Sequence, residues 1–358
     1  MTTHRIHALA REKPARDTSS DDEGAAFLVG DIGGTNARFA LARPGGGGLA
    51  PGEVTAFPTA RHASLVAAIG AFLDERGNPP LAGLALAAAG PLSGEGAAAR
   101  IAMTNHPWTV EVRDLATFAE APVLMNDFAA VAMAVPALGP DDVVTLGGAG
   151  GDPSAPAVVL GAGTGLGVAG LVRREGRTLV LPGEGGHADL AAGNASEAEL
   201  IARLWRDHPH VSAERVLSGP GLVLLHQAIA ARDGDAADHV RAPQDVALGD
   251  LDGSCSVCKR TIDQFCDWLG AFAGDLALIF GARGGVWIAG GIVPNWVSGR
   301  TRGRFDALRF RARFLDKGRF RDWLADVPVH VVTRPDPALL GLARALAERV
   351  DGGTAPPR

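Results

Sequence analysis

The sequence predicts an α/β protein with two related halves, and three observations support this prediction. Apolar runs typical of buried strands alternate with segments in which apolar residues recur at helical spacing. Two strands around a glycine-rich turn occur twice, at residues 27–42 and 157–172. The chain has 358 residues, and globular domains hold roughly 100–200 residues each. We therefore expect two α/β domains with a ligand bound between them.

The first half begins with a buried strand at Phe27–Asp31, a tight turn at Gly33 and Gly34, and a second strand at Ala37–Ala42. Helical spacing of apolar residues predicts a helix at Ser64–Arg76. The same criteria predict strands at 84–89 and 123–125 and a helix at 127–135.

A segment rich in glycine, aspartate and proline, Gly147–Pro156, is a candidate boundary between the halves. The alternation restarts with strands at Ala157–Leu160 and Val168–Val172. Helices are expected at 197–205, 221–231, 261–280 and 338–349, and strands at 285–291 and 327–332. Nine Lys or Arg residues lie within 300–321, where phenylalanines recur at helical spacing, so we expect a solvated helical region and no nucleic-acid patch.

The charge balance excludes several classes of partner. Lysine and arginine total 34 and aspartate and glutamate 40, a formal net charge of −6. This balance gives no general attraction to nucleic acid or anionic lipid, so we expect neither partner. Without a run of about 18 apolar residues, no membrane span is expected. Residues 1–24 mix charge with proline and serine and lack an apolar signal-peptide core, which predicts a disordered tail on a cytoplasmic protein.

The chain has three cysteines, Cys255, Cys258 and Cys266, which are too few and too clustered for a disulfide framework. Cys255 and Cys258 form a CxxC pair, but no second pair or histidine pair accompanies it, so we expect no zinc site. A redox role would place the motif at the start of a helix. Cys258 does precede an expected helix, and this alternative stays open.

Two glycine-rich turns have the composition of phosphate-binding loops. In Gly30–Asn36, glycines let backbone N–H groups approach a phosphate, and Asp31 could hold a hydrated Mg²⁺. The turn Gly161–Gly167 contains a GxGxxG-like spacing, but a strand follows it where a dinucleotide site needs a helix. Each turn alone could be an ordinary glycine hairpin. Two of them in related halves suggest a nucleotide held in a cleft between domains.

Candidate catalytic and ligand-binding residues lie after one expected strand and in two turns. Asn126 and Asp127 stand where α/β proteins place ligands, so Asp127 could accept a proton from a hydroxyl, although both residues also cap helices well. Glu184 and His187 share a glycine-rich turn that suits a sugar, and Glu214 precedes turn residues ahead of an expected helix. Alternatively, Glu184 lies in a surface turn, His187 is structural and Glu214 is a solvated surface charge.

The motifs together resemble those of bacterial glucokinases outside the ROK family of sugar kinases. The matching segments span residues 27–345 and appear in the order expected of that family. The segments are LVGDIGGTNARFALA, TNHPW, NDFAAVAMA, GAGTGLGVAGL, PGEGGHADLA, ERVLSGPGL, GGVWIAGGIVP, FLDKGRF and PALLGLA. One departure is Ala162, where the family usually has proline, and the Cys-rich zinc motif of ROK sugar kinases is absent.

The resemblance implies a two-domain α/β protein with the actin-like ATPase (ribonuclease H-like) fold and a hinged cleft. It implies a small domain at 25–137, completed by a C-terminal helix at 333–350, and a large domain at 138–332. The implied reaction moves the γ-phosphate of ATP, with Mg²⁺, to the 6-hydroxyl of glucose in a cytoplasmic homodimer. Asp127 would be the catalytic base, and sugar binding is implied for Asn126, Asp127, Glu184, His187 and Glu214. Nucleotide binding is implied for Gly30, Asp31, Ile32, Gly33, Gly34, Thr35, Gly161, Gly163, Thr164, Gly165, Gly290 and Gly291, with Asp31 holding Mg²⁺ through water.

Three alternatives remain at this point. A kinase for another hexose, such as mannose or fructose, would share most of these motifs. A sugar sensor or repressor would need a DNA-binding domain, for which the segment before Phe27 is too short. An actin-like filament or chaperone-type ATPase would have no use for the Asn126–Asp127 and Glu184–His187 pairs together.

Overall fold

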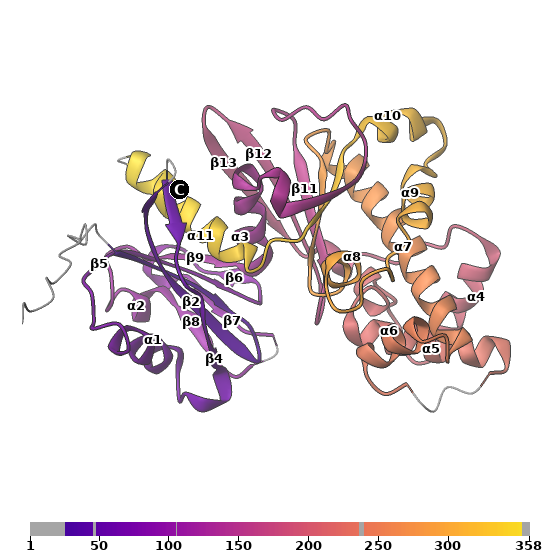
Figure 1. The fold of residues 1–358 in the computed structure, drawn as a ribbon, viewed down its shortest axis with the longest axis horizontal. Coiled ribbons are helices and arrows are strands. Elements are labelled where there is room, and N and C mark those ends of the chain that lie inside the picture. The colour runs from indigo at the N-terminus through magenta and orange to yellow at the C-terminus, as the bar shows by residue number, and fades with distance from the viewer. Residues whose placement is uncertain (1–25, 46–47, 105, 236–239, 353–358) are drawn as a thin grey trace, which may run out of the picture.

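The computed structural model describes residues 26–45, 48–104, 106–235 and 240–352, and the expected disordered tail at 1–24 lies outside them. Within the described residues the strands form two six-stranded sheets and one three-stranded sheet (Figure 1). The first sheet is built from the N-terminal part of the chain and the second from its middle and late parts.

The first sheet has the order β3-β2-β1-β5-β9, with β4 paired to β2. Its centre is the parallel pair β1 and β5, whose runs of Leu, Val and Ala are buried on both faces. The strands are β1 (Ala26–Ile32), β2 (Asn36–Gly45), β3 (Gly48–Pro51), β4 (Thr55–Pro58), β5 (Leu81–Ala88) and β9 (Val123–Asn126). The small third sheet beside it contains β6 (Leu92–Ser93), β7 (Arg100–Ala102) and β8 (Thr109–Glu111).

The second sheet has the order β10-β15-β14-β11-β12-β13. Its strands are β10 (Val143–Gly147), β11 (Ala157–Ala162), β12 (Leu166–Arg174), β13 (Arg177–Gly183), β14 (Val286–Gly290) and β15 (Val329–Val332). The glycine-rich segment 147–156 therefore connects β10 to β11 inside this sheet. It is a long surface connection and does not separate the two halves, contrary to expectation.

The two large sheets share one plan, as the internal repeat predicts. In each, an antiparallel hairpin (β1–β2 or β11–β12) places its first strand parallel to a later strand (β5 or β14). The last ladder pairs before the two turns are Ile32 with Ala37 and Ala162 with Leu166. Each glycine turn thus closes a hairpin at the same position of its sheet.

Two helices, α3 (Asp127–Ala134) and α11 (Pro337–Gly352), lie between the sheets (Figure 1). They approach closely, because a Cβ on Gly341 would come within 1.8 Å of the Ala130 carbonyl oxygen. On the other side of α3, a Cβ on Gly167 of β12 would come within 1.9 Å of the Phe128 ring. One apolar cluster joins α3 and α11 to strands of both sheets. Helix α3 is therefore packed against both halves of the molecule.

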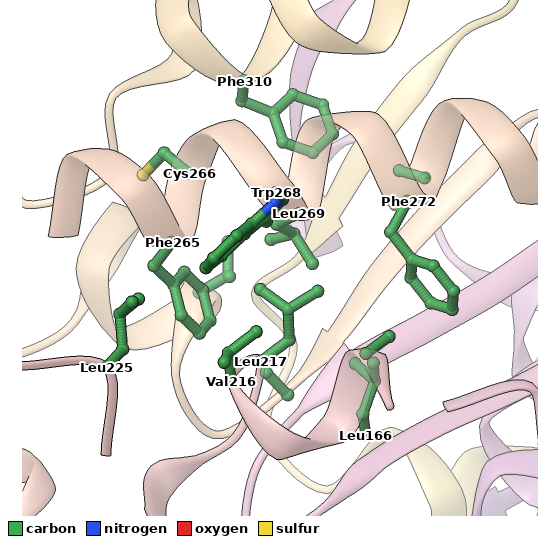
Figure 2. Close-up of a cluster of buried hydrophobic side chains, with 14 of the residues drawn as sticks. Leu166, Val216, Leu217, Leu225, Phe265, Cys266, Trp268, Leu269, Phe272 and Phe310 are labelled. Carbon is green, nitrogen blue, oxygen red and sulfur yellow. The ribbon is translucent and has the colours of Figure 1, made fainter. Parts of the chain in front are cut away.

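The second half carries a large helical region around α7 (Ser256–Phe280). Its core packs Phe265, Trp268 and Phe272 against Leu217 and Phe310, all of them buried (Figure 2). Phe310 and Phe314 of α9 (Ala307–Leu315) are fully buried and belong to this core, whereas Phe320 of the same basic segment is 42% exposed. The other helices are α1 (Leu65–Asp74), α2 (Val112–Leu115), α4 (Ala195–Leu204), α5 (Gly219–Asp233), α6 (Pro243–Leu251), α8 (Val293–Ser298) and α10 (Arg321–Asp326).

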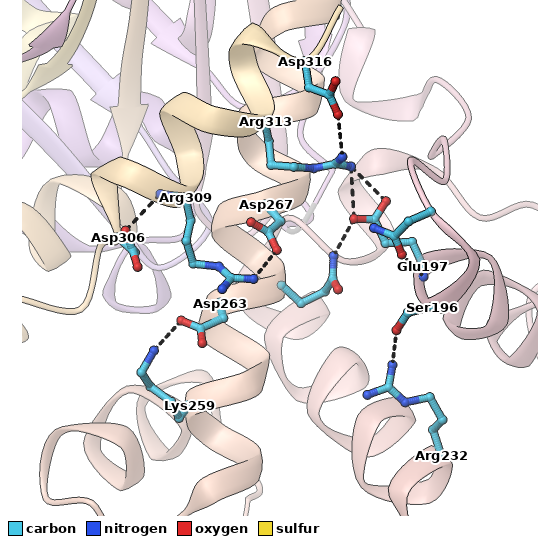
Figure 3. Close-up of polar contacts among 12 residues, drawn as sticks. Ser196, Glu197, Arg232, Lys259, Asp263, Asp267, Asp306, Arg309, Arg313 and Asp316 are labelled. Atoms are coloured by element: carbon cyan, nitrogen blue, oxygen red, sulfur yellow. Dashed lines mark hydrogen bonds and ion pairs between the residues drawn. The ribbon is translucent and has the colours of Figure 1, made fainter.

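A buried ion pair ties α9 to the start of α4 (Figure 3). Arg313 Nη2 lies 3.0 Å from both carboxylate oxygens of Glu197, whose side chain is 1% exposed. Glu197 also accepts a hydrogen bond from the Gly193 amide at 2.6 Å. This pair therefore fixes the segment that connects α4 to the turn holding Glu184 and His187. In the part of the chain that the structure describes, no helix combines the length and apolar character needed to cross a membrane.

Candidate active site

The first glycine turn, residues 33–35 between β1 and β2, is held by its own backbone and by Thr59. The Gly33 amide donates to the Asn36 carbonyl at 3.0 Å. Thr59, which is 2% exposed, donates its amide to the Thr35 carbonyl at 3.0 Å and its hydroxyl to the Gly34 carbonyl at 2.9 Å. The carbonyls of Gly34 and Thr35 are thus engaged, and the turn is fixed before any ligand arrives.

Two residues before this turn serve packing. A Cβ on Gly30 would lie 2.6 Å from Leu86 Cδ2 and 2.7 Å from Phe39 Cδ1, so a larger residue where β1 passes β5 would require these side chains to move. The Ile32 side chain is fully buried in the core of the first half. Ile32 could therefore contact a nucleotide only through its backbone.

Asp31, at the end of β1, lies among other carboxylates. Burial raises the pKa of Asp31 to about 7, with further increases from the charges of Asp127 and Asp336, while Arg38 lowers it. Arg38 Nε lies 3.3 Å from Oδ1 of Asp336, the residue directly before α11. A buried carboxylate beside other carboxylates is stabilised by a cation. The carboxylate oxygens around Asp31 are donors of the kind that Mg²⁺ prefers, and a metal ion held there by Asp31 stays a prediction.

The second glycine turn, residues 163–165 between β11 and β12, is held by α5. The Gly163 amide donates to the Gly165 carbonyl at 2.8 Å, and the Gly219 amide donates to the Gly163 carbonyl at 2.7 Å. Thr164, at the tip, is exposed. The amides of Gly291 and Ile292 both donate to the Ala162 carbonyl, at 3.0 and 3.1 Å.

The end of β14 lies directly against this turn. A Cβ on Gly161 would lie 2.6 Å from the Ala289 carbonyl carbon. Gly290 has φ +84°, and a Cβ there would lie 2.4 Å from the Ala162 carbonyl oxygen. The structure thus brings Gly161–Gly165 and Gly290–Gly291 together, which the sequence predicts only as two separate motifs.

Asn126 and Asp127 lie at the junction of β9 and α3. Two roles are considered for them, capping of the helix and contact with a ligand, and each residue takes a different one. Asn126 is the N-cap, and its Oδ1 accepts from the amides of Phe128 and Ala129 at 2.9 and 3.2 Å. Its Nδ2 donates to the Gly90 carbonyl at 3.1 Å, which leaves one N–H for a ligand. Because Asn126 caps the helix, Asp127 is free for another role.

Asp127 is the first residue of α3 and has a carboxylate suited to proton transfer. Burial raises the pKa of Asp127 to about 6; the Phe128 amide, donating at 2.9 Å, lowers it, and the charge of Glu184 raises it. A base whose pKa lies just below neutral is deprotonated at pH 7 and still accepts a proton readily. The influence of Glu184 on Asp127, and of Asp127 on Asp31, places the three carboxylates in one electrostatic cluster.

The turn with Glu184 and His187 rests on β12. Glu184 and His187 are exposed, and a Cβ on Gly186 would lie 2.0 Å from the Leu166 carbonyl oxygen. Glu214 joins this turn to the second glycine turn. Its Oε2 accepts from the Leu166 amide at 2.7 Å, and its Oε1 lies 3.9 Å from His187 Nε2. Glu214 is therefore a connecting residue and not a solvated surface charge.

Sequence reasoning did not single out four residues that hold the site. These residues are Thr59, which fixes the first turn; Gly219, which contacts the second; and the ion pair Arg38–Asp336 beside Asp31. Arg38 and Gly219 lie within the quoted motifs GGTNARFALA and ERVLSGPGL. The positions of Thr59 and Asp336 follow only from the fold.

Sugar kinases are among the solved structures with the same architecture. The chain superposes with a TM-score of 0.78 and 38% identity on glucokinase from an Antarctic psychrotroph, covering 90% of this chain and 98% of that one. It also superposes on a ROK-family glucokinase from Streptomyces griseus solved with glucose and AMPPNP, at TM-score 0.60 and 18% identity, covering 91% and 100%; that identity shows the fold alone. The fold and site therefore define a sugar kinase with the actin-like ATPase fold, as expected.

Sequence comparison narrows this class. The profile of the family described as Glucokinase matches residues 28–349. A glucokinase of Yersinia enterocolitica is 43% identical over 328 residues, and one of Cronobacter sakazakii is 42% identical over 324; each match covers 90% of this chain and 97% of the relative. The chain belongs to the glucokinase family, which confirms the resemblance.

Proposed function

We propose that this protein phosphorylates glucose, moving the γ-phosphoryl group of ATP to the 6-hydroxyl to give glucose 6-phosphate and ADP. Family membership supports the reaction. The single structural observation that carries it is Asp127, a carboxylate with a pKa of about 6 in one electrostatic cluster with Asp31 of the nucleotide side and Glu184 of the sugar side.

In this proposal Asp127 accepts the proton of the 6-hydroxyl as that oxygen attacks the phosphorus. Glucose lies beside it, held by Asn126, Glu184, His187 and Glu214. Glu184 and His187 are exposed and present polar atoms with little bulk around them. Carboxylates accept hydrogen bonds from several hydroxyls at once, which suits a sugar. Asn126 contributes its remaining N–H, because its other polar positions serve the cap.

The two glycine turns would bind the phosphates of ATP through backbone N–H groups. The first is Gly30–Thr35 and the second Gly161–Gly165, with Gly290 and Gly291 on the adenosine side. Transfer of a phosphoryl group depends mainly on positioning and charge neutralisation, so rigid turns serve it well. Asp31 would hold Mg²⁺ through water, and the metal ion would neutralise phosphate charge.

We also propose that the two halves close on the substrates, with 25–137 and 333–350 as one domain and 138–332 as the other. The connections that cross between them lie together, since Arg334 Nη1 contacts Asp142 Oδ1 at 3.0 Å and the Thr333 amide donates to the Asp142 carbonyl at 2.8 Å. Closure would exclude water and limit ATP hydrolysis.

A cytoplasmic homodimer is part of this proposal. The edge strand β13 exposes Leu179 and Leu181, at 59% and 42%, which offers a surface for a second copy. Light scattering of the purified protein over a range of concentrations tests the dimer. A monomer at all concentrations would contradict it.

A coupled assay of ADP release with ATP and a panel of hexoses tests the reaction. We expect the highest kcat/KM with glucose and no turnover with 6-deoxyglucose, which lacks the attacking hydroxyl. A higher kcat/KM with mannose or fructose would make the protein a kinase for that hexose. Turnover with none of them would contradict the proposed function.

A further inference from the structure

Cys255, Cys258 and His226 form a buried cluster outside the proposed active site. The structure joins Cys255 and Cys258 by a disulfide at the N-terminus of α7. His226 of α5 is fully buried, and its Nε2 lies 3.7 Å from Cys255 Sγ. The sequence shows no second cysteine pair or histidine pair beside the CxxC motif, and the fold brings one histidine to it, from α5 and 29 residues away.

Helix α6 packs directly over the cysteine pair. The Cys255 amide donates to the Gly249 carbonyl at 3.1 Å. A Cβ on Gly249 would lie 3.0 Å from Cys258 Sγ, so the space over the sulfur atoms is filled. The turn 252–254 between α6 and α7 is exposed and leads straight into Cys255. Opening this turn would expose the sulfur atoms to a small reagent.

Helices α5 and α6 both run from the cysteine cluster to the second glycine turn. At the far end of α6, Pro243 lies against Gly219, where a Cβ would be 3.3 Å from Pro243 Cγ. Gly219 begins α5, and its amide holds the Gly163 carbonyl at 2.7 Å. The cysteine pair and the proposed phosphate turn are therefore connected by two packed helices.

We propose that Cys255 and Cys258 are a reversible dithiol–disulfide pair whose state changes the binding of ATP at the second glycine turn. The part about ATP rests on the proposed function. The oxidant is a low-molecular-weight disulfide. The Cys255 thiolate attacks one of its sulfur atoms and releases one thiol, and the Cys258 thiolate then displaces the second. The two thiols of the pair give up two electrons and two protons, and the oxidant becomes two thiols.

The local geometry favours Cys255 as the attacking group. Its Sγ accepts a hydrogen bond from the Cys258 amide at 3.0 Å, at the positive end of the 25-residue helix α7. A helix N-terminus stabilises a thiolate. His226 Nε2 is placed to share the proton that Cys255 releases. Cys266, which is also buried, forms no disulfide in the structure, and burial raises the pKa of its thiol to about 12, so it stays out of the exchange.

The test uses the full chain in glutathione buffers from fully reduced to fully oxidised. Thiols are counted after denaturation, intact mass is measured, and KM for ATP is determined for each form. We expect three thiols in the reduced form and one in the oxidised form, with a mass lower by two hydrogens. Because the disulfide form holds Gly219 on Gly163, reduction should raise KM for ATP by about threefold to tenfold.

Two variants serve as controls. C255S keeps an oxygen that can cap α7, so it should fold, retain activity and lose its response to glutathione. C266A should respond as the wild type does. Three thiols at every glutathione ratio, or stoichiometric zinc in the reduced protein, would overturn the redox pair. If the disulfide between Cys255 and Cys258 forms and KM for ATP stays the same, the proposed coupling to ATP binding is wrong. Thiol counts that change in a protein unable to phosphorylate glucose would reject the proposed function and leave the redox pair standing.

Discussion

The two glycine hairpins have the same position in their sheets and differ in what holds them. At the first, Asp31 presents a carboxylate one residue before the end of the strand. At the same position of the second, Gly161 has no side chain and lies against the backbone of Ala289. The first turn is held by Thr59 of its own sheet region, and the second by Glu214 and Gly219 from the helical region.

The difference shows how a repeated hairpin can serve two tasks. The first half contributes charge, with Asp31 near the end of β1 and Asp127 directly after β9, two strands of one sheet that are separated by β5. The second half contributes a close backbone surface, because Gly161 and Gly290 remove Cβ atoms between β11 and β14. Changes in the first half should therefore affect catalysis, and changes in the second should affect binding and stability.

The largest effect should come from Asp127→Asn in the first half. Asparagine keeps the size of the side chain but removes the base, so kcat should fall by about 10²–10⁴-fold. The fold should persist, because Asn126 and not Asp127 is the N-cap of α3. The measurement is kcat with saturating glucose and ATP, with thermal unfolding as the control. A folded variant that keeps more than a tenth of the wild-type kcat would reject Asp127 as the base.

Glu214→Gln tests the second half. The substitution removes a charged acceptor from the Leu166 amide and from the contact with His187, at a cost of about 1.5–3 kcal/mol. We expect kcat/KM to fall for both glucose and ATP, because Glu214 connects the two binding turns. Glu199→Gln, on the exposed face of α4, is the matched control and should have no effect. An effect on glucose alone would show that the link to the glycine turn is unimportant.

Gly161→Ala and Gly30→Ala compare the two hairpins directly. The new Cβ on Gly161 would meet backbone atoms of Ala289, which cannot move aside, so unfolding free energy should fall by about 1–3 kcal/mol. On Gly30 it would meet the side-chain atoms of Leu86 and Phe39, which can shift, and the loss should be smaller. Gly163→Ala, whose Cβ would be 3.8 Å from the nearest neighbour, should be nearly neutral. Urea unfolding measures the free energy of unfolding of all three variants. Equal losses for Gly30→Ala and Gly161→Ala would show that the two hairpins do not differ in how tightly they are packed.

The smallest effect is a shift in the pH profile. Asp127 must be deprotonated to act as a base, so kcat should fall as the pH drops below about 6. Glu184→Gln removes a like charge that raises this pKa, so the acidic limb should move to lower pH. The profile is measured at saturating Mg²⁺, ATP and glucose for both proteins. An acidic limb that does not move would show that the charge of Glu184 does not act on Asp127.

Local patterns in the sequence were enough to predict the parts of the site that follow directly from strands and turns. The junction of β9 and α3 was visible in the run Val123–Val135, and the hairpins were visible as apolar runs around glycine. The division of roles between Asn126 and Asp127 was not, because both residue types cap helices and only the backbone geometry selects one.

Contacts between distant segments could not be predicted. Thr59 reaches Gly34 across 25 residues, Leu166 reaches Glu214 across 48, and Cys255 reaches His226 across 29. No local propensity records such pairs, since they depend on how helices and sheets pack. The prediction of a boundary between the halves at 147–156 failed for a related reason. A glycine- and proline-rich composition is typical of any long turn, including one that connects two strands of the same sheet.

The place of α11 at the end of the chain has a consequence for synthesis on the ribosome. Helix α11 supplies Leu339, Leu342 and Leu346 to the apolar cluster that contains residues of β1 and β5, although β5 ends about 250 residues earlier in the chain and β1 about 300 residues earlier. One face of the nascent N-terminal sheet therefore stays uncovered until α11 has emerged from the ribosome. During translation the first sheet is therefore made early and completed late.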